Sequence, residues 1–365
     1  MTILPVSKPD LSGNELKYLT ECIETGWISS QGPFVLRLEN AFANYTGSKY
    51  AVACSSGTTA LTLALAALKI GPGDEVIVPE FTMIASAWAV TYIGAKPVFV
   101  DCGDDLNIAV KHIERAITPH TKAIVPVHIY GRPCNMPEIL KLAHDYNLYV
   151  VEDACEAHGA KGVGVGDVTC YSLFANKIIS AGEGGLVTTN DERIYKQLIH
   201  LRGMAFDDSH SFLHKKLGYN FRMTNLQAAV GLAQLERIDE FLAKRKQIQE
   251  WYDVKLKAHT LPRPEGSVLW MYDVVFKNEV IRDKVQYHLA RNGIETRVFF
   301  KPMSDQPMYK DSFRVIRARD ASQMGFYLPT YTQITRQEVD FISNKVLEAL
   351  NGQDEIKTNT GRDVG

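Results

Sequence analysis

A lysine stands where an apolar run gives way to a glycine-rich segment. In the stretch Ser172-Leu-Phe-Ala-Asn-Lys177-Ile-Ile-Ser-Ala-Gly182-Glu-Gly-Gly185, Lys177 follows the end of a predicted strand. Ligands of open α/β sheets bind beyond the carboxyl ends of the strands, and glycine lets the backbone approach them closely. A neutral lysine amine at this place could attack a carbonyl group or abstract a proton. Judged by position alone, Lys177 is equally compatible with a solvated surface charge.

An acidic pair follows another apolar run. The segment Glu152-Asp153-Ala-Cys-Glu156-Ala-His158 comes directly after the predicted strand over 148–151. An acid at the end of a buried strand can face a bound pyridine nitrogen and keep it protonated, so that the ring withdraws electrons from a substrate carbanion. The alternative is a helix N-cap, for which aspartate is a preferred residue. For Asp153 taken alone, the N-cap is the favoured interpretation.

Small and hydroxylic residues open a predicted helix over Ala60–Leu68. They are Ser55, Ser56, Gly57 and Thr58. The free N–H groups of a first helical turn, with a glycine beside them, suit a phosphate ester. Helix capping alone also explains hydroxyl groups at this place. The three features in this chain order, a phosphate nest followed by an acid and a lysine at strand ends, form a specific combination.

The combination resembles that of the fold-type I enzymes dependent on pyridoxal 5′-phosphate (PLP), and within them the DegT/DnrJ/EryC1/StrS sugar aminotransferase family. The resemblance covers about residues 4–350. It is carried by residues 26–32, 73–79, 127–131, Glu152-Asp153, Asn176-Lys177, 182–185 and 218–225. It implies an α/β fold-type I transferase, with a large domain built on a mostly parallel sheet and a smaller C-terminal αβ domain.

The resemblance also implies a role for each matching residue. Lys177 is expected to be the Schiff-base lysine and proton shuttle, and Asp153 to lie at the pyridinium nitrogen. Further cofactor contacts are expected from Ser56, Gly57, Thr58, Met83, Glu156 and Ser172, with Glu156 beside the phenolic oxygen. Relatives share their active sites across a dimer interface, so Asn220 is expected to reach the phosphate of the neighbouring subunit.

One position departs from the family pattern. Relatives usually stack an aromatic residue on the cofactor ring within the segment after Pro79, whereas Met83 is aligned there in this chain. A thioether can also pack against an aromatic face. Phe81 or Trp88 would supply the ring if the alignment shifted slightly, so the stacking residue stays open among these three.

Five residues are expected to contact the substrate: Trp27, Ser29, His128, Arg297 and Tyr309. A planar guanidinium such as that of Arg297 can bind a carboxylate or a diphosphate through two hydrogen bonds, although a solvated arginine at a strand edge is the alternative. His128 follows a predicted strand, where a histidine more often packs or forms hydrogen bonds within the protein.

The family resemblance narrows the reaction. Segments around Trp27, 218–225 and 306–309 are most similar to those of members that aminate GDP-4-keto-6-deoxymannose. Amination of dTDP-4-keto-6-deoxyglucose is the second reading, and a non-catalytic regulatory protein of the same fold is a third. PLP-dependent sugar dehydratases carry histidine in place of the lysine, so Lys177 argues against that activity. The implied partners are a nucleotide-linked keto sugar, L-glutamate and a second copy of the chain.

The elements that must position these residues can be read from the apolar pattern. Short β-branched runs at 75–78, 97–100, 122–127 and 148–151 alternate with helical segments. This alternation is typical of a mostly parallel sheet covered by helices on both faces. The run Gly162–Gly166 leads into a further β-like stretch rather than a helix, so it is interpreted as a turn and not as a dinucleotide-binding loop.

The domain boundaries follow from the same pattern. Residues 1–245 are predicted to form the large PLP-binding domain, with an N-terminal segment that can pack on the small domain, and residues 246–350 to form the small domain. An amphipathic helical stretch is predicted from Asn225 to about Leu256. The polar tail 351–365 is expected to be disordered.

The composition excludes several classes of function. The 365 residues have a formal net charge of −2, so no basic field exists to hold nucleic acid or an anionic membrane. Neither a signal peptide nor an apolar stretch of membrane-spanning length is recognisable, which predicts a cytoplasmic protein. The six cysteines are scattered singly and are expected to be reduced, without a metal site.

Overall fold

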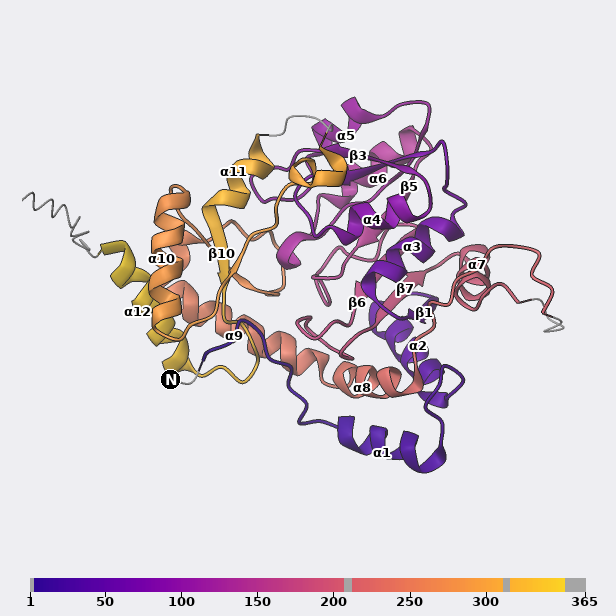
Figure 1. Ribbon diagram of the computed structural model, residues 1–365, viewed down its shortest axis with the longest axis horizontal. Coiled ribbons are helices and arrows are strands. Elements are labelled where there is room, and N and C mark those ends of the chain that lie inside the picture. The colour runs from indigo at the N-terminus through magenta and orange to yellow at the C-terminus, as the bar shows by residue number, and fades with distance from the viewer. Residues whose placement is uncertain (1–2, 207–211, 311–315, 352–365) are drawn as a thin grey trace, which may run out of the picture.

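The computed structural model describes residues 3–206, 212–310 and 316–351. Two sheets organise this part of the chain (Figure 1), a larger one of seven strands in the order β1-β7-β6-β5-β4-β2-β3 and a smaller one of three in the order β8-β10-β9. The strands of the larger sheet are β1 (Tyr50–Cys54), β2 (Glu75–Pro79), β3 (Lys96–Val100), β4 (Thr121–Ile124), β5 (Tyr149–Asp153), β6 (Val168–Ser172) and β7 (Gly185–Thr189).

The larger sheet is mostly parallel, as predicted. Strands β3, β2, β4, β5 and β6 pair in parallel, whereas β7 runs antiparallel to both of its neighbours, β6 and β1. The four predicted strands coincide with β2 to β5. Strand β4 ends at Ile124 instead of Val127, because Pro126 has no N–H to continue the ladder.

Helices cover both faces of this sheet. The helices associated with it are α1 (Glu15–Thr25), α2 (Pro33–Thr46), α3 (Gly57–Ala67), α4 (Ala85–Tyr92), α5 (Val110–Ala116), α6 (Met136–Asp145) and α7 (Glu192–Arg202). Side chains of a strand alternate between faces. Accordingly, Val76 and Val78 belong to the large core that contains α3, whereas Ile77 packs with Ile113 and Ile139 from α5 and α6.

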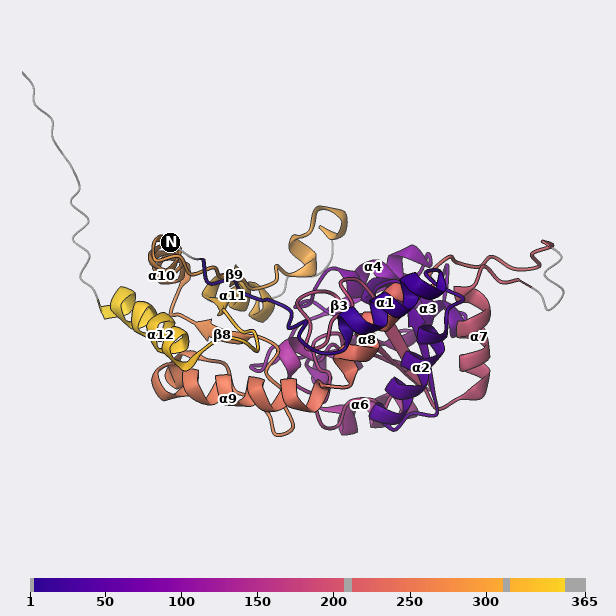
Figure 2. The same ribbon diagram turned by 90° about the horizontal axis from the view of Figure 1, so that it is seen from below.

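The smaller sheet carries a second core. It consists of β8 (Tyr272–Val275), β10 (Gly325–Leu328) and β9 (Arg297–Val298), with β10 antiparallel to both neighbours. Helices α9 (Ile238–Leu256), α10 (Glu279–Arg291) and α12 (Arg336–Asn351) contribute to its core, and α11 (Arg317–Met324) precedes β10. Near the N-terminus, Leu4 forms a bridge with Ile294, so the first residues run along this part of the molecule (Figure 2).

The structure corrects the prediction of one amphipathic helix from Asn225 to Leu256. Two helices occupy this stretch, α8 (Asn225–Leu235) and α9, and Glu236 with Arg237 lies between them. Glu236 accepts hydrogen bonds from the N-terminal segment, and Arg237 forms an ion pair with Asp10. Helix α8 is also not amphipathic, because most of its residues are buried.

The predicted domain boundary and the predicted C-terminal tail can be compared with the structure only in part. The predicted boundary between residues 245 and 246 falls inside α9, and the division into two domains stays a prediction. Asn351 is the last residue of α12, and the rest of the predicted tail, 352–365, lies outside the described residues. Within the described ranges, no helix is both long enough and apolar enough to cross a membrane.

Candidate active site

A pocket of about 430 Å³ opens at the carboxyl ends of the central strands. It brings together most of the residues that the sequence singled out: Ser56, Gly57, Thr58, Met83, Asp153, Glu156, Ser172, Lys177 and Arg297. They come from α3, from the turns after β2, β5 and β6, and from β9 in the smaller sheet. The pocket therefore lies between the two sheets, at the place where parallel sheets bind their ligands.

Asp153 ends strand β5 and lies almost fully buried in this pocket. Its Oδ2 accepts a hydrogen bond of 2.7 Å from the Ser86 hydroxyl, and its Oδ1 accepts one of 3.1 Å from the Cys155 N–H. No helix begins after Asp153; residues 154–159 form turns. The N-cap interpretation therefore does not apply, and the carboxylate is held facing the pocket.

The N-terminus of α3 forms the opposite wall. Ser56 caps the helix by accepting a hydrogen bond from the Thr59 N–H, whereas the N–H groups of Gly57 and Thr58 belong to the first turn and have no partner within the helix. A side chain at position 57 would not fit, because a Cβ there would lie 2.8 Å from Ser172 Cβ. The backbone at Gly57 and the side chain of Ser172 therefore lie close together in the pocket.

Lys177 follows β6 and points toward Glu156. Its Nζ lies 3.6 Å from Glu156 Oε1 and 4.4 Å from the ring centroid of Trp270. The Tyr130 N–H donates to Glu156 Oε2 at 2.9 Å. Burial raises the pKa of Glu156 above its ordinary value, although the Lys177 ammonium acts in the opposite direction. Lysine, carboxyl group and aromatic face thus form one contiguous cluster.

The three candidates for stacking on the cofactor ring, Met83, Phe81 and Trp88, differ in their position relative to the pocket. Met83 lines the pocket and is 47% exposed. Phe81 is fully buried and contacts the rings of Tyr130 and Phe299, and neither Phe81 nor Trp88 lines the pocket. Among the three candidates, Met83 is the one that presents its side chain to the space in front of Asp153.

Three predicted residues lie outside this pocket. Trp27, Ser29 and Asn220 are exposed, and none of them lines it. Asn220 Oδ1 accepts a hydrogen bond of 3.0 Å from Arg222 Nε. The role of Asn220 in a neighbouring subunit stays a prediction.

His128 and Tyr309 are also not brought into the pocket. The His128 ring is fully buried, with Nδ1 accepting from the Cys134 N–H at 3.0 Å and Nε2 lying 2.8 Å from Glu152 Oε2. Because a backbone N–H can only donate, Nδ1 is unprotonated and Nε2 carries the proton. The Tyr309 hydroxyl forms a hydrogen bond of 2.7 Å with Thr91 Oγ1.

The glycine run 162–166 is a turn, as interpreted from the sequence. The N–H groups of Gly164, Val165 and Gly166 all donate to the carboxylate of Glu152. Burial alone would raise the pKa of Glu152, but His128 and these N–H groups hold it below its ordinary value. The run therefore binds a carboxylate of its own chain, on the strand that ends in Asp153.

Sequence reasoning missed several residues of the pocket. Trp270 and Phe300 line it from segments that flank the strands of the smaller sheet, and Ser86 supports Asp153 from α4. Each aromatic residue lies in an apolar stretch that reads as ordinary core, and Ser86 is separated from Asp153 by 67 positions. The sequence carried no local signal for them.

The arrangement of polar groups fits PLP. The first turn of α3 with Ser172 offers hydrogen-bond donors for a phosphate, Asp153 offers a fixed carboxylate for a pyridine nitrogen, and Lys177 offers an amine. In addition, Asn176 Oδ1 is buried without a hydrogen-bond partner among the described residues. An acceptor left unpaired in a ligand pocket is a group that a bound molecule can satisfy.

Comparisons with known proteins agree with this chemistry. The chain matches the model of the DegT/DnrJ/EryC1/StrS aminotransferase family over residues 9–347. It is 45% identical over 367 residues to the GDP-perosamine synthase of Caulobacter vibrioides, which covers 95% of this chain and 97% of that protein. It is 40% identical over 359 residues to the GDP-perosamine synthase of Escherichia coli O157:H7, covering 95% of this chain and 99% of that protein.

A solved structure shares the fold over nearly the whole length. The DesV protein of S. venezuelae, determined in complex with a ketimine intermediate, superposes with a TM-score of 0.90 at 30% identity. The match covers 97% of this chain and 100% of that one. The chain therefore belongs to the DegT/DnrJ/EryC1/StrS aminotransferase family and is a PLP-dependent sugar aminotransferase with the α/β architecture of fold-type I enzymes.

Proposed function

We propose that the protein transfers the amino group of L-glutamate to the 4-keto carbon of GDP-4-keto-6-deoxymannose, giving GDP-perosamine. The observation that carries this proposal is the full-length identity of 45% and 40% to two GDP-perosamine synthases. Each match covers 95% of this chain and nearly the whole of the relative.

The amino group is carried in two half-reactions. Bound PLP supplies an electron sink for the carbon that loses or gains a proton. Lys177 is the group we assign to move that proton, because its amine lies in the pocket beside Glu156. The side chain is only 12% exposed, which limits access of water to the amine while the proton is held.

Asp153 and Glu156 have complementary tasks in this proposal. Asp153 keeps the pyridine nitrogen protonated, and Ser86 with the Cys155 N–H fixes the orientation of its carboxylate. Glu156, whose pKa is raised by burial, is assigned to the side of the phenolic oxygen, and the Tyr130 N–H fixes the orientation of its carboxyl group. The two buried carboxyl groups are thus assigned to different atoms of the cofactor ring.

Substrate recognition is assigned to residues around the mouth of the pocket. Arg297 lines it from β9 with a 64% exposed side chain, and its Nη2 lies 3.4 Å from Glu295 Oε1. A guanidinium with free donors can bind the carboxylate of glutamate or a diphosphate oxygen. Trp27, Ser29 and Asn220 would act in the site of the second subunit of a homodimer.

A panel of nucleotide sugars tests the substrate. The PLP-loaded enzyme is incubated with L-glutamate and the 4-keto-6-deoxy sugars of GDP, dTDP and UDP, and 2-oxoglutarate and the amino sugar are quantified. We expect turnover of GDP-4-keto-6-deoxymannose with a kcat/KM far above that of the others. A preference for the dTDP sugar would replace the proposal with its closest rival.

A reaction with L-glutamate and no sugar tests whether the protein catalyses the first half of the transamination. We expect L-glutamate to bleach the yellow PLP-loaded enzyme and to release 2-oxoglutarate stoichiometrically in the absence of sugar. An absorbance spectrum unchanged by glutamate and by other amino donors would instead favour a regulatory protein that keeps the fold without the reaction.

A further inference from the structure

Lys177 needs support that its own segment does not provide. It lies in the connection 173–184 between β6 and β7, which contains no helix or strand. Lysine has a flexible four-carbon side chain that loses much conformational freedom when it is fixed. A group that moves a proton between two defined atoms must nevertheless be held close to its working geometry. The contacts around Lys177 therefore have a positioning task.

Trp270 contacts both the backbone and the side chain of this segment. Its indole N–H donates to the carbonyl oxygen of Asn176 at 3.0 Å, directly before Lys177. Its ring face lies 4.4 Å from Lys177 Nζ. We propose that Trp270 is the positioning residue for Lys177, fixing its backbone through the indole N–H and its amine through the ring face.

The indole is itself rigidly held. It is only 1% exposed, and its ring stacks on Tyr130 with centroids 5.7 Å apart and planes 24° apart. The carbonyl oxygen of Trp270 accepts a hydrogen bond of 2.6 Å from the buried guanidinium of Arg245. A side chain without freedom to move can transmit its own position to a flexible partner.

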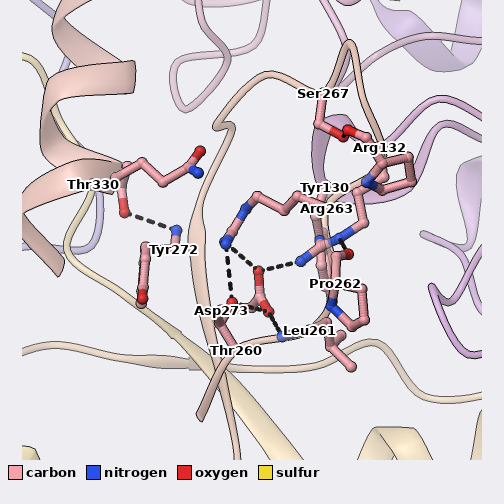
Figure 3. A network of polar contacts seen from close by, with 12 residues as sticks. Tyr130, Arg132, Thr260, Leu261, Pro262, Arg263, Ser267, Tyr272, Asp273 and Thr330 are labelled. Atoms are coloured by element: carbon pink, nitrogen blue, oxygen red, sulfur yellow. Dashed lines mark hydrogen bonds and ion pairs between the residues drawn. The ribbon is translucent and has the colours of Figure 1, made fainter. Parts of the chain in front are cut away.

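An ion-pair network fixes the segment that carries Tyr130, the residue on which Trp270 stacks. Tyr130 has a left-handed backbone, with φ 53°, and lies two positions before Arg132, whose Nη2 lies 2.6 Å from Asp273 Oδ1 (Figure 3). Arg263 contacts the same carboxylate oxygen at 2.7 Å. Asp273 belongs to β8, three positions after Trp270, so the segment carrying Tyr130 and the strand following Trp270 are fastened together.

The contacts on the amine act from different sides. Glu156 Oε1 lies 3.6 Å from Nζ and attracts its charge, whereas the indole face attracts a cation through its quadrupole. The same Tyr130 whose ring supports Trp270 donates its N–H to Glu156 Oε2. Tyr130 therefore orients both groups that contact the Lys177 amine, the Trp270 ring and the Glu156 carboxyl group. The two neighbours define where the amine rests when it is not bonded to cofactor or substrate.

Two replacements separate the contributions of Trp270. Trp270→Leu removes both the N–H donor and the ring face, whereas Trp270→Phe keeps an aromatic face and loses the donor. Trp251→Leu is the matched control, because Lys244 Nζ lies the same 4.4 Å from that ring, on the remote helix α9. Circular dichroism and gel filtration identify any variant that fails to fold.

The first measurement follows the lysine without turnover. PLP is added to each apoenzyme and the absorbance of the bond between PLP and Lys177 is recorded with time. We expect this bond to form about 100-fold more slowly in Trp270→Leu, since misplacement of a reacting group by about 1 Å can cost that much, and about tenfold more slowly in Trp270→Phe. Trp251→Leu should match the wild type.

The second measurement distinguishes positioning from substrate binding. In single-turnover reactions with glutamate, we expect Trp270→Leu to lower the rate constant with little change in half-saturation, and to enlarge the isotope effect of α-deuterated glutamate. Proton transfer becomes more rate-limiting when the lysine is misplaced. Partial recovery of the rate in Trp270→Phe completes the expected pattern.

The inference rests on the role proposed for Lys177, and the two can fail separately. Lys177→Ala examined alongside shows whether the absorbance belongs to this lysine at all. If it does, a folded Trp270→Leu with wild-type rates in both measurements would overturn the positioning role. So would a defect confined to half-saturation by the sugar, since Trp270 would then be a substrate contact instead.

Discussion

The Ser86 hydroxyl lies 2.7 Å from Oδ2 of Asp153, and both groups are buried. Ser86 stands in the first turn of α4, and its Oγ is also 3.0 Å from Thr82 Oγ1. The Cys155 N–H holds the other carboxylate oxygen. Asp153 is thereby oriented by donors from two directions.

Replacing Asp153 with asparagine tests the importance of its charge. The amide is nearly isosteric but cannot keep the pyridine nitrogen protonated, so we expect kcat to fall by about 10² to 10⁴. PLP affinity should change much less, because the phosphate contacts remain. Titration of apoenzyme with PLP and steady-state kinetics measure the two quantities. Asp167→Asn is the control, and a near-native rate for Asp153→Asn would remove this residue from the mechanism.

Asp273 is predicted to be important for stability. Burial alone would raise its pKa, but Arg132 and Arg263 hold it below its ordinary value. Asp273→Ala leaves these two guanidinium groups without their shared partner, and breaking such a buried pair costs about 3–5 kcal/mol. Urea unfolding measures the loss. Lys141→Ala, which breaks the exposed pair with Asp145, should leave stability nearly unchanged, and equal effects of the two variants would contradict this interpretation.

The buried carboxyl group of Glu80 is expected to make the free energy of unfolding depend on pH. It is fully buried between β2 and the segment at Ser304, whose N–H donates to it at 2.9 Å, and burial raises its pKa above 4.5. The native state then binds the proton more tightly than the unfolded state. The resulting stability is complete below pH 4.5 and is lost as the pH rises through the raised pKa.

Thermal unfolding between pH 5 and pH 8 measures this contribution. We expect Glu80→Gln to flatten the decline of Tm with rising pH, because the amide does not ionise. Glu250→Gln, an exposed position on α9, serves as the control and should follow the wild type. Parallel pH profiles for wild type and Glu80→Gln would show that Glu80 does not ionise in this range.

The assignment of Asn220 to the neighbouring subunit predicts complementation. Lys177→Ala and Asn220→Lys proteins should each be inactive alone. In a heterodimer, one site has both defects and the other has neither, by the symmetry of an isologous dimer. Mixing under conditions that exchange subunits should therefore restore activity, with about half of the heterodimer's sites working. Proven exchange without recovery would place Asn220 in the site of its own subunit.

The sequence predicted the parts of the site that depend on local context. Asp153, Lys177 and the turn at Gly57 each follow or precede a regular element, so their place at one edge of the sheet could be derived. Trp270 could not be found this way, because its partner Asn176 is 94 positions distant. The left-handed backbone of Tyr130 likewise depends on tertiary contacts, and the break between α8 and α9 depends on pairing with the N-terminal segment.

The central claim is that Lys177 bonds covalently to PLP in the resting enzyme. Borohydride reduction of the PLP-loaded protein, followed by proteolysis and mass spectrometry, locates the pyridoxyl group on a single residue. We predict the modification on Lys177 alone, and a Lys177→Ala protein that binds PLP reversibly, carries no label and does not transaminate. A pyridoxyl group on another lysine of the wild type, or transamination by the Lys177→Ala protein, would contradict the account.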